Sequence, residues 1–226
     1  MVTLYYGDNL NVLRDEIKDE SVDLIYLDPP FNSKMDYNLL FKTPKGHKSD
    51  AQITAFKDTW SWGEQAEREF SEILKQPNTD VAELITALRR FLKENDLMAY
   101  LVMMASRLLE LHRVLKPTGS LYLHCDPTAG HYVKILLDAV FGVTQFKNEI
   151  SWKRSTNPSS ISKIFRRTHD VIFFYSKTEN YTFNMQYKEL SEASKKLYSK
   201  DDETGTYRLV PLLVSGKRNG VTGQDW

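Results

Sequence analysis

The chain has 226 residues, with 30 Lys and Arg against 30 Asp and Glu and 41% hydrophobic residues, which is enough for one large domain and too apolar for a disordered protein. No apolar run approaches the roughly 18 residues of a membrane helix, no charged and apolar leader opens the chain, and the single cysteine excludes an internal disulfide or a zinc site built from cysteines. We therefore expect a cytoplasmic protein with no membrane partner.

The first 28 residues predict a strand, a helix and a second strand. Val2–Tyr6 is rich in β-formers, and apolar residues then recur at helical spacing between residues 10 and 17. The mostly apolar run Val22–Leu27 is typical of a buried parallel strand. Asp28 follows it directly, at the edge where open α/β sheets bind their ligands.

An irregular insertion and three helices are predicted next. Residues 32–62 mix Gly, Pro, charges and large aromatics, and a loop of this length is usually functional or disordered. Helices are predicted over Glu64–Leu74, over Asp80–Lys93 with Asp80 as its cap, and over Asp96–Leu115. The last carries a stripe of Leu and Met at helical spacing, which we interpret as core.

The second half predicts a strand over Ser120–Cys125 and a helix over Ala129–Phe141 that Gly142 closes. Phe146–Trp152 and Asp170–Tyr175 are also β-like. They have no helix between them, so they should pair antiparallel. Beyond residue 178 the chain is polar and lysine-rich, with one possible helix at residues 190–198.

Positive charge is concentrated between Lys147 and His169, where six basic residues stand against one acid, Glu149. A solvated loop explains such a run as readily as a nucleic-acid contact does. The aromatic and small polar residues within it, such as Trp152 and Asn157, favour nucleic acid.

The sequence Asp28-Pro29-Pro30-Phe31 is the most informative feature. Two successive prolines fix φ and remove two backbone donors, which leaves carbonyl oxygens without helix or sheet partners. A carboxylate beside a carbonyl forms a double acceptor for an exocyclic amino group, and Phe31 offers a stacking surface for a base. A strand-ending Pro-Pro turn with an incidental acid is the alternative.

Further sequence segments along residues 4–177, together with this motif, give the chain a family resemblance. It resembles the β-group amino-methyltransferases of type II and type III restriction–modification systems, which methylate adenine N6 or cytosine N4. The supporting segments are Gly7-Asp8-Asn9-Leu10, Asn32-Ser33, Tyr37-Asn38, Phe56-Lys57-Asp58-Thr59-Trp60, Arg107-Leu108-Leu109-Glu110, the run 113–120, Leu123-His124-Cys125-Asp126, the run 148–154 and the run 168–175.

The resemblance implies a Rossmann-like sheet, permuted with its catalytic motif first, that binds S-adenosylmethionine beside a base flipped out of double-stranded DNA. It assigns the amino-group contacts to Asp28 and the Pro29 carbonyl in a turn that Pro30 stiffens, and base stacking to Phe31. Asp8 and Asp28 become candidates for contact with the cofactor. The target base or DNA would be contacted by Asn32, Ser33, Trp152, Lys153, Arg154, Arg166 and Arg167. No metal is implied.

An Asp at the head of this motif resembles the adenine-specific members. Transfer would be a direct displacement aided by positioning, so Cys125 has no nucleophilic task and we interpret it as a buried small residue. We interpret His124, His131 and His169 as structural or surface residues. Methylation of cytosine N4 or of an RNA base, and a non-catalytic DNA-binding subunit, remain alternatives.

One departure from the family pattern concerns the glycine-rich cofactor motif, roughly Asp-Pro-Phe-x-Gly-x-Gly, which has no counterpart here. We therefore expect an incomplete sheet and a longer natural enzyme whose main cofactor motif lies beyond Trp226. Residues 1–177 would be the catalytic region and residues 178–226 the start of target recognition. A homodimer or a restriction subunit is a possible protein partner.

Overall fold

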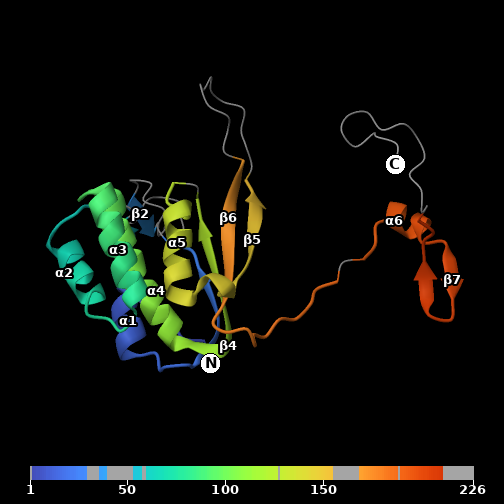
Figure 1. Cartoon of the computed structure of the whole chain (residues 1–226), viewed down its shortest axis with the longest axis horizontal. Helices are drawn as coiled ribbons and strands as arrows, with labels where there is room; N and C mark the ends of the chain where they lie inside the picture. Colours follow the sequence, from blue (N-terminus) through green and yellow to red (C-terminus); the bar gives the residue numbers. More distant parts are fainter. Residues whose placement is uncertain are drawn as a thin grey trace, which may run out of the picture. The chain divides into compact units, whose positions relative to one another are not determined.

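The computed structural model describes residues 2–29, 36–39, 53–57, 60–126, 128–154, 168–187 and 189–210. The chain divides into two compact units, Met1–Thr182 and Phe183–Trp226 (Figure 1). The sequence-based boundary after residue 177 lies close to this division, and the role of the second unit in target recognition stays a prediction.

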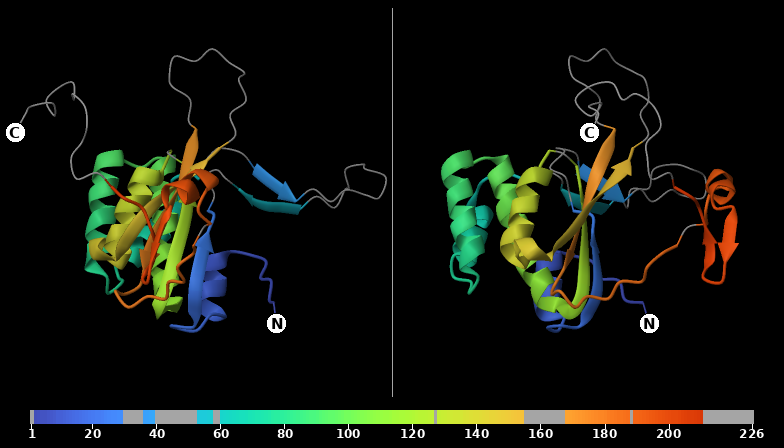
Figure 2. Two further views of the ribbon diagram at one scale, coloured as in Figure 1. Left: turned by 90° about the vertical axis from the view of Figure 1, so that its right-hand side faces the viewer. Right: turned by 45° about the vertical axis from the view of Figure 1, so that its right-hand side comes forward.

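The first unit contains a four-stranded sheet in the order β1-β4-β6-β5, with helices to one side of it (Figure 2). Its strands are β1 (Val22–Leu27), β4 (Leu115–Cys125), β6 (His169–Ser176) and β5 (Phe146–Lys153). β1 is parallel to β4, whereas β4 with β6 and β6 with β5 are antiparallel. The predicted α/β fold with an antiparallel hairpin at the edge of the sheet is confirmed.

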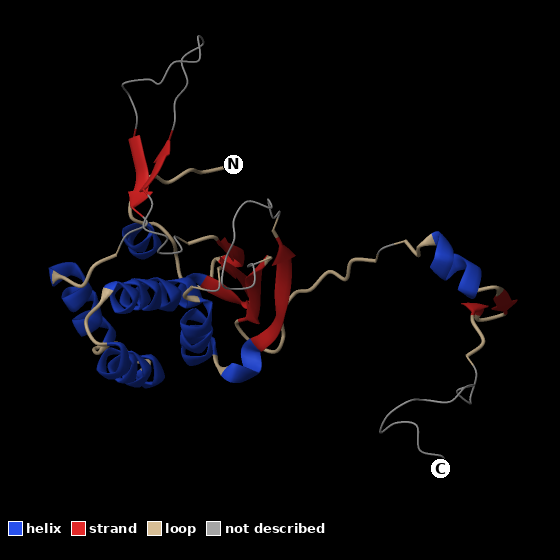
Figure 3. Cartoon of the chain, turned by 90° about the horizontal axis from the view of Figure 1, so that it is seen from above, coloured by secondary structure: helices blue, strands red, loops and turns tan. Residues whose placement is uncertain are grey.

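Five helices lie on one side of this sheet (Figure 3). They are α1 (Asn9–Asp15), α2 (Glu64–Ile73), α3 (Thr79–Leu92), α4 (Asp96–Val114) and α5 (Gly130–Phe141), and a 3₁₀ turn η1 (Val143–Gln145) follows α5. α4 contacts each of the other four, and 13 of its 19 residues are buried. The apolar stripe predicted for this helix is therefore core, as expected, and the burial extends well beyond one stripe.

The helix ends show which residues begin and end the helices α3 and α5. Asn78, not Asp80, caps α3: its side chain accepts from the backbone N–H of Val81 at 3.1 Å, and Asp80 lies inside the first turn. The Asp80 prediction was wrong by two residues because an asparagine with extended backbone precedes it. Gly142 closes α5 as predicted, with φ at +91°, a conformation that favours glycine.

The predicted strand at Val2–Tyr6 is wrong. The segment forms no strand, and Val2 is 99% exposed. A β-rich run becomes a strand only where a neighbour offers backbone partners, and none of the described strands pairs with it. Conversely, the region expected to be irregular contains a hairpin of β2 (Asp36–Leu39) and β3 (Ile53–Lys57).

β4 also begins earlier than predicted, directly after α4. The segment Lys116-Pro117-Thr118-Gly119 was expected to separate helix from strand, yet it lies within β4. The register shows how: Val22 pairs with Leu115 and Leu24 with Ser120, so β4 holds extra residues opposite β1. A bulge of this kind admits a proline that a regular ladder would exclude.

The two faces of the sheet differ. On the helix side, Leu121, Leu123 and Tyr175 are fully buried. On the other face of β1, Leu24 is 58% and Tyr26 57% exposed, so the expectation that Val22–Leu27 is buried on both faces was wrong for the described residues. β1 is at the end of the strand order, and no described strand pairs with its outer edge.

The second unit contains α6 (Glu192–Leu197) and a hairpin of β7 (Lys200–Asp202) and β8 (Gly205–Tyr207). The helix predicted near residues 190–198 is thus confirmed, and Ser191 caps it by accepting from the backbone N–H of Ser194. Among the residues described, no helix combines the length and apolar character needed to cross a membrane.

Candidate active site at the carboxyl end of the sheet

Asp28 lies at the carboxyl end of β1, beside the end of the parallel strand β4. Its side chain is 61% exposed, whereas Pro29 is buried. Pro30, Phe31, Asn32 and Ser33 are outside the described residues, so the expectations for them stay predictions. The described part of the motif is a carboxylate open to solvent on a turn that is anchored by its first proline.

His124 is a neighbour of Asp28 that the sequence interpretation missed. Its Nδ1 lies 3.2 Å from Oδ1 of Asp28, and its Nε2 lies 3.4 Å from Oδ2 of Asp170. Because β1 and β4 are adjacent and parallel, a residue just past the end of β1 meets the penultimate residue of β4. Only the pairing of two strands that are far apart in the sequence could have revealed this, and the spacing of histidines alone did not.

Three of the predicted DNA-contacting residues are described, and they lie at the end of β5. Trp152 is exposed and pairs in register with Asp170, and Lys153 pairs with His169. Arg154 donates its backbone N–H to the Thr168 carbonyl and its guanidinium lies 3.2 Å from Asp170. Arg166 and Arg167 are outside the described residues.

The strand registers place Asp28, His124, Asp170 and Trp152 on one face of the sheet. His124 pairs with Ile172, and Asp170 is two residues from Ile172 on the same strand face. Trp152 is directly opposite Asp170, and cross-strand partners share a face. An exposed carboxylate and an exposed indole therefore lie at the same end and on the same face of the sheet, with β4 and β6 between them.

Asp8, the candidate for cofactor contact, already has structural partners. Its Oδ1 accepts from the Leu10 backbone N–H at 2.9 Å, which caps α1, and from the guanidinium of Arg107 at 2.7 Å. Arg107 is buried and also donates to Asn9 and to the Met103 carbonyl. This network joins α1 to α4, and a contact of Asp8 with a cofactor stays a prediction.

Cys125 is buried at the end of β4, as expected. Burial raises the pKa of its thiol to about 12, and nearby carboxylates, first that of Asp126, act in the same direction. A thiol with this pKa remains protonated near neutral pH, and only the thiolate is a good nucleophile. The geometry therefore agrees with a packing role for Cys125 beside Gly130, where an added Cβ would lie 3.2 Å from its sulfur.

We expect Cys125 to react slowly with a thiol reagent in the folded chain at pH 8 and rapidly after unfolding in guanidinium chloride. Exposure in the unfolded state returns the thiol to its ordinary pKa and opens access to the sulfur. Release of the chromophore from a disulfide reagent measures both rates on the same sample. Equal rates in the two states would show that Cys125 is accessible in the folded protein.

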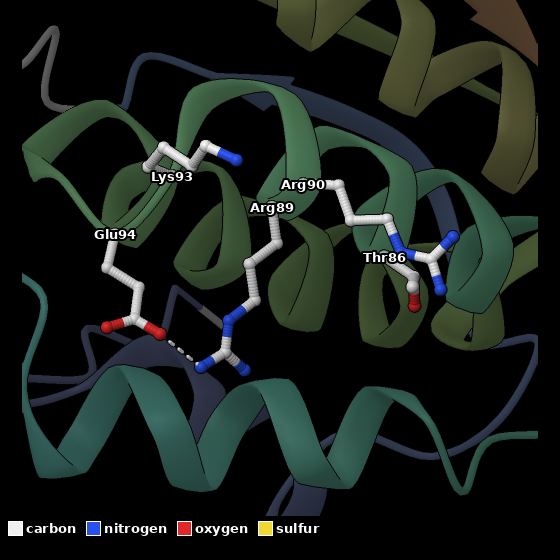
Figure 4. Close-up of a pocket in the computed structure, with 5 residues that line it drawn as sticks. All are labelled: Thr86, Arg89, Arg90, Lys93 and Glu94. Carbon is white, nitrogen blue, oxygen red and sulfur yellow. Dashed lines mark hydrogen bonds and ion pairs between the residues drawn. The ribbon is translucent and has the colours of Figure 1, made fainter.

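A surface pocket elsewhere is lined by α3 and the turn after it, at Thr86, Arg89, Arg90, Lys93 and Glu94 (Figure 4). Arg89 is occupied there: it pairs with Glu94 at 2.6 Å and with Glu67 at 2.8 Å, and its guanidinium covers the ring of Trp62. The pocket contains no residue of the Asp28 site, so we assign it no part in the chemistry.

Known proteins resemble the chain along most of its length. The DNA methylase family model (N6_N4_Mtase) matches residues 22–219. The type II methyltransferase M.EcaI of Enterobacter cloacae is 34% identical over 129 residues, which are 57% of this chain and 28% of that protein. The Mod subunit of the type III restriction-modification enzyme StyLTI of Salmonella typhimurium (strain LT2) is 27% identical over 221 residues, 96% of this chain and 30% of that subunit.

Among solved structures, PvuII DNA methyltransferase (cytosine-N4-specific) aligns with this chain at 14% identity and a TM-score of 0.41. The aligned part is 91% of this chain and 66% of that one. At that level the likeness adds nothing to the assignment. The chain spans about a third of the length of the curated relatives it matches. The match over residues 22–219 includes the Asp28 strand, the core helix and the antiparallel pair. The chain belongs to the N6/N4 DNA methylase family.

Proposed function

We propose that this chain carries the catalytic part of a DNA methyltransferase that transfers a methyl group to the exocyclic amino group of adenine. The observation that supports this most is the placement of Asp28: an exposed carboxylate at the carboxyl end of a parallel strand, on the same sheet face as Trp152. The family match supports methylation of an amino nitrogen, and the Asp-first motif favours adenine N6 over cytosine N4.

The main task of the protein in this reaction would be to orient the amino group of the target base. The amino nitrogen is a poor nucleophile because its lone pair is delocalised into the base. Acceptors at the Asp28 carboxylate and the Pro29 carbonyl would hold its two N–H groups and direct the lone pair outward. Methyl transfer would be a direct displacement with the neutral thioether of the cofactor as leaving group, and the proton lost from the nitrogen would pass to the Asp28 carboxylate or to water. Holding the partners in line supplies much of the rate enhancement.

S-adenosylmethionine, when bound, supplies the electrophilic methyl group on a positively charged sulfur. The described residues fit one half of such a site, since the exposed Asp28 carboxylate could offer a negative charge to a positively charged sulfur. For the adenosine half they offer only Asp8, which Arg107 and the α1 cap already contact. The six described glycines include no Gly-x-Gly pair between a strand and a helix.

The test is the chemical identity of the product. The active enzyme is incubated with DNA and with cofactor labelled in its methyl group, and the DNA is digested to nucleosides for mass spectrometry. N6-methyladenine is the expected product. N4-methylcytosine would correct the base while leaving the family chemistry in place, and label in RNA only would correct the substrate. Absence of any methylated nucleoside would favour a non-catalytic DNA-binding role.

We also propose that the basic segment between β5 and β6 contacts DNA phosphates. Replacing Arg154, Arg166 and Arg167 by Ala should weaken binding to every DNA sequence, because phosphate contacts carry no sequence information. The slope of log affinity against log salt should flatten by about 0.9 for each phosphate that the variant no longer neutralises. Titration of labelled duplexes at several salt concentrations measures the slope.

The pairing of Arg154 with the buried Asp170 refines this expectation. We expect Arg154→Ala to flatten the slope less than Arg166→Ala or Arg167→Ala does singly, since part of the Arg154 charge is already neutralised. Replacement of Arg90, which belongs to α3, by Ala is the matched control and should leave the slope unchanged. An unchanged slope in the triple variant would mean that these arginines are solvated or structural.

A further inference from the structure

A continuous line of contacts runs from Asp28 through His124 on β4 and Asp170 on β6 to Arg154. His124 lies between two carboxylates, with Nδ1 3.2 Å from Asp28 and Nε2 3.4 Å from Asp170. Asp170 in turn lies 3.2 Å from the guanidinium of Arg154. The line therefore crosses neighbouring strands of the sheet and ends at the base of the basic segment.

The members of this line differ greatly in exposure. The Asp28 side chain is 61% exposed, His124 is 16% exposed and Asp170 is 7% exposed. A buried carboxylate is stable only when it is paired. Loss of the contact with His124 or with Arg154 would therefore destabilise the buried Asp170. An exposed carboxylate at the end of a strand incurs no such penalty when a partner is lost, so its orientation depends on the groups that contact it.

The imidazole can transfer the order of Asp170 to Asp28. Its ring is planar and rigid, so fixing Nε2 against Asp170 also fixes the position of Nδ1. One ring nitrogen faces each carboxylate, so the ring is in contact with both at once. Asp170 also contacts the guanidinium of Arg154. Its carboxylate is therefore held in place by a second residue besides His124.

We propose that His124 is a positioning residue that holds the Asp28 carboxylate in the orientation needed to accept from the target amino group. The proposal rests on the proposed function, in which Asp28 is that acceptor. His124 itself touches neither the base nor the methyl group. Its value is geometric, because a misplacement of about 1 Å in a reacting assembly can cost on the order of 10²-fold in rate.

Two substitutions of His124 separate positioning from mere structural support. Asparagine places an amide nitrogen near the position of Nδ1 and so preserves a donor for Asp28. Glutamine places its amide nitrogen near Nε2 and preserves the link to Asp170 instead. Because positioning needs both contacts of the ring, it predicts that each substitution lowers kcat by about 10- to 100-fold, with KM for DNA and cofactor nearly unchanged. A purely structural role predicts near-wild-type kcat for His124→Gln and a loss for His124→Asn, because only glutamine retains the contact with the buried Asp170.

His131 supplies the matched control, since it is exposed on α5 and has no place in this line. His131→Asn and His131→Gln in the active enzyme should retain wild-type kcat. Near-wild-type kcat in His124→Gln would overturn the positioning role. An inactive wild-type enzyme, or an active Asp28→Ala variant, would overturn the proposed function instead, so the two failures are distinguishable.

A second measurement covers the case in which both His124 variants fail to fold. Asp28→Asn changes an exposed residue, and the ring nitrogen resonances of ¹⁵N-histidine-labelled protein report on its neighbours. We expect the His124 resonances to shift between wild type and Asp28→Asn while those of His131 stay in place. Unchanged His124 resonances would mean that the ring does not contact Asp28 in solution, and the proposal would be wrong.

Discussion

Asp28→Ala is expected to lower methyl transfer by on the order of 10²- to 10³-fold while leaving DNA affinity nearly intact. The carboxylate would act on the reacting amino group, and loss of a single preorganised electrostatic group at a reaction centre has effects of about this size. Affinity for DNA depends mainly on phosphate contacts elsewhere. Methyl incorporation from labelled cofactor and a gel-shift assay on the same preparation measure the two quantities.

Asp23→Ala is the matched control for this substitution. Asp23 lies on β1, the strand that Asp28 follows, is more exposed than Asp28, and pairs with Lys116 at 2.7 Å. Because exposed ion pairs contribute little, we expect the Asp23 variant to retain wild-type turnover. Near-normal turnover of the Asp28 variant would remove Asp28 from the chemistry, and equal damage from both substitutions would point to a defect of strand β1.

The sequence predicted best those features whose signals are local. The antiparallel pair of β5 and β6 followed from two β-rich runs with no helix between them, and the burial of α4 followed from its periodic Leu and Met residues. Gly142 was predictable as a helix end because glycine adopts positive φ without strain.

The errors and omissions arise where the structure depends on pairing between segments that are distant in the sequence. Val2–Tyr6 has the composition of a strand but no described partner, and a bulge in β4 absorbs Pro117 where a break was expected. His124 and Asp170 join Asp28 only through the registers of three strands. Periodicity along the chain contains no information on such registers, so the line from Asp28 to Arg154 could not be predicted from the sequence.

The second large effect concerns the 226-residue chain in isolation, which we expect to bind S-adenosylmethionine weakly or not at all. Its described residues supply a carboxylate at Asp28 but no glycine-rich turn that could approach the cofactor closely. Calorimetric titration of this chain with the cofactor measures the affinity. Tight one-to-one binding would show that the chain contains a complete cofactor site and that our expectation of a motif beyond Trp226 is wrong.

The same chain in isolation is expected to self-associate through β1. No described strand covers the outer edge of β1, and Leu24 and Tyr26 expose apolar surface beside it. An uncovered strand edge next to apolar side chains favours pairing with another chain. Sedimentation velocity should therefore show species larger than the monomer, and the double substitution Leu24→Lys, Tyr26→Lys should shift them toward the monomer by adding charge to this face.

Phe91→Lys is the control for this double substitution, because Phe91 is even more exposed than Leu24 but lies on α3, away from the edge. A charge added there should leave the distribution of species unchanged, since it does not touch the uncovered strand. If both variants shift the distribution equally, association is driven by general surface hydrophobicity. If neither does, the edge of β1 is covered in solution, and the apolar side chains beside it are not what brings the chains together.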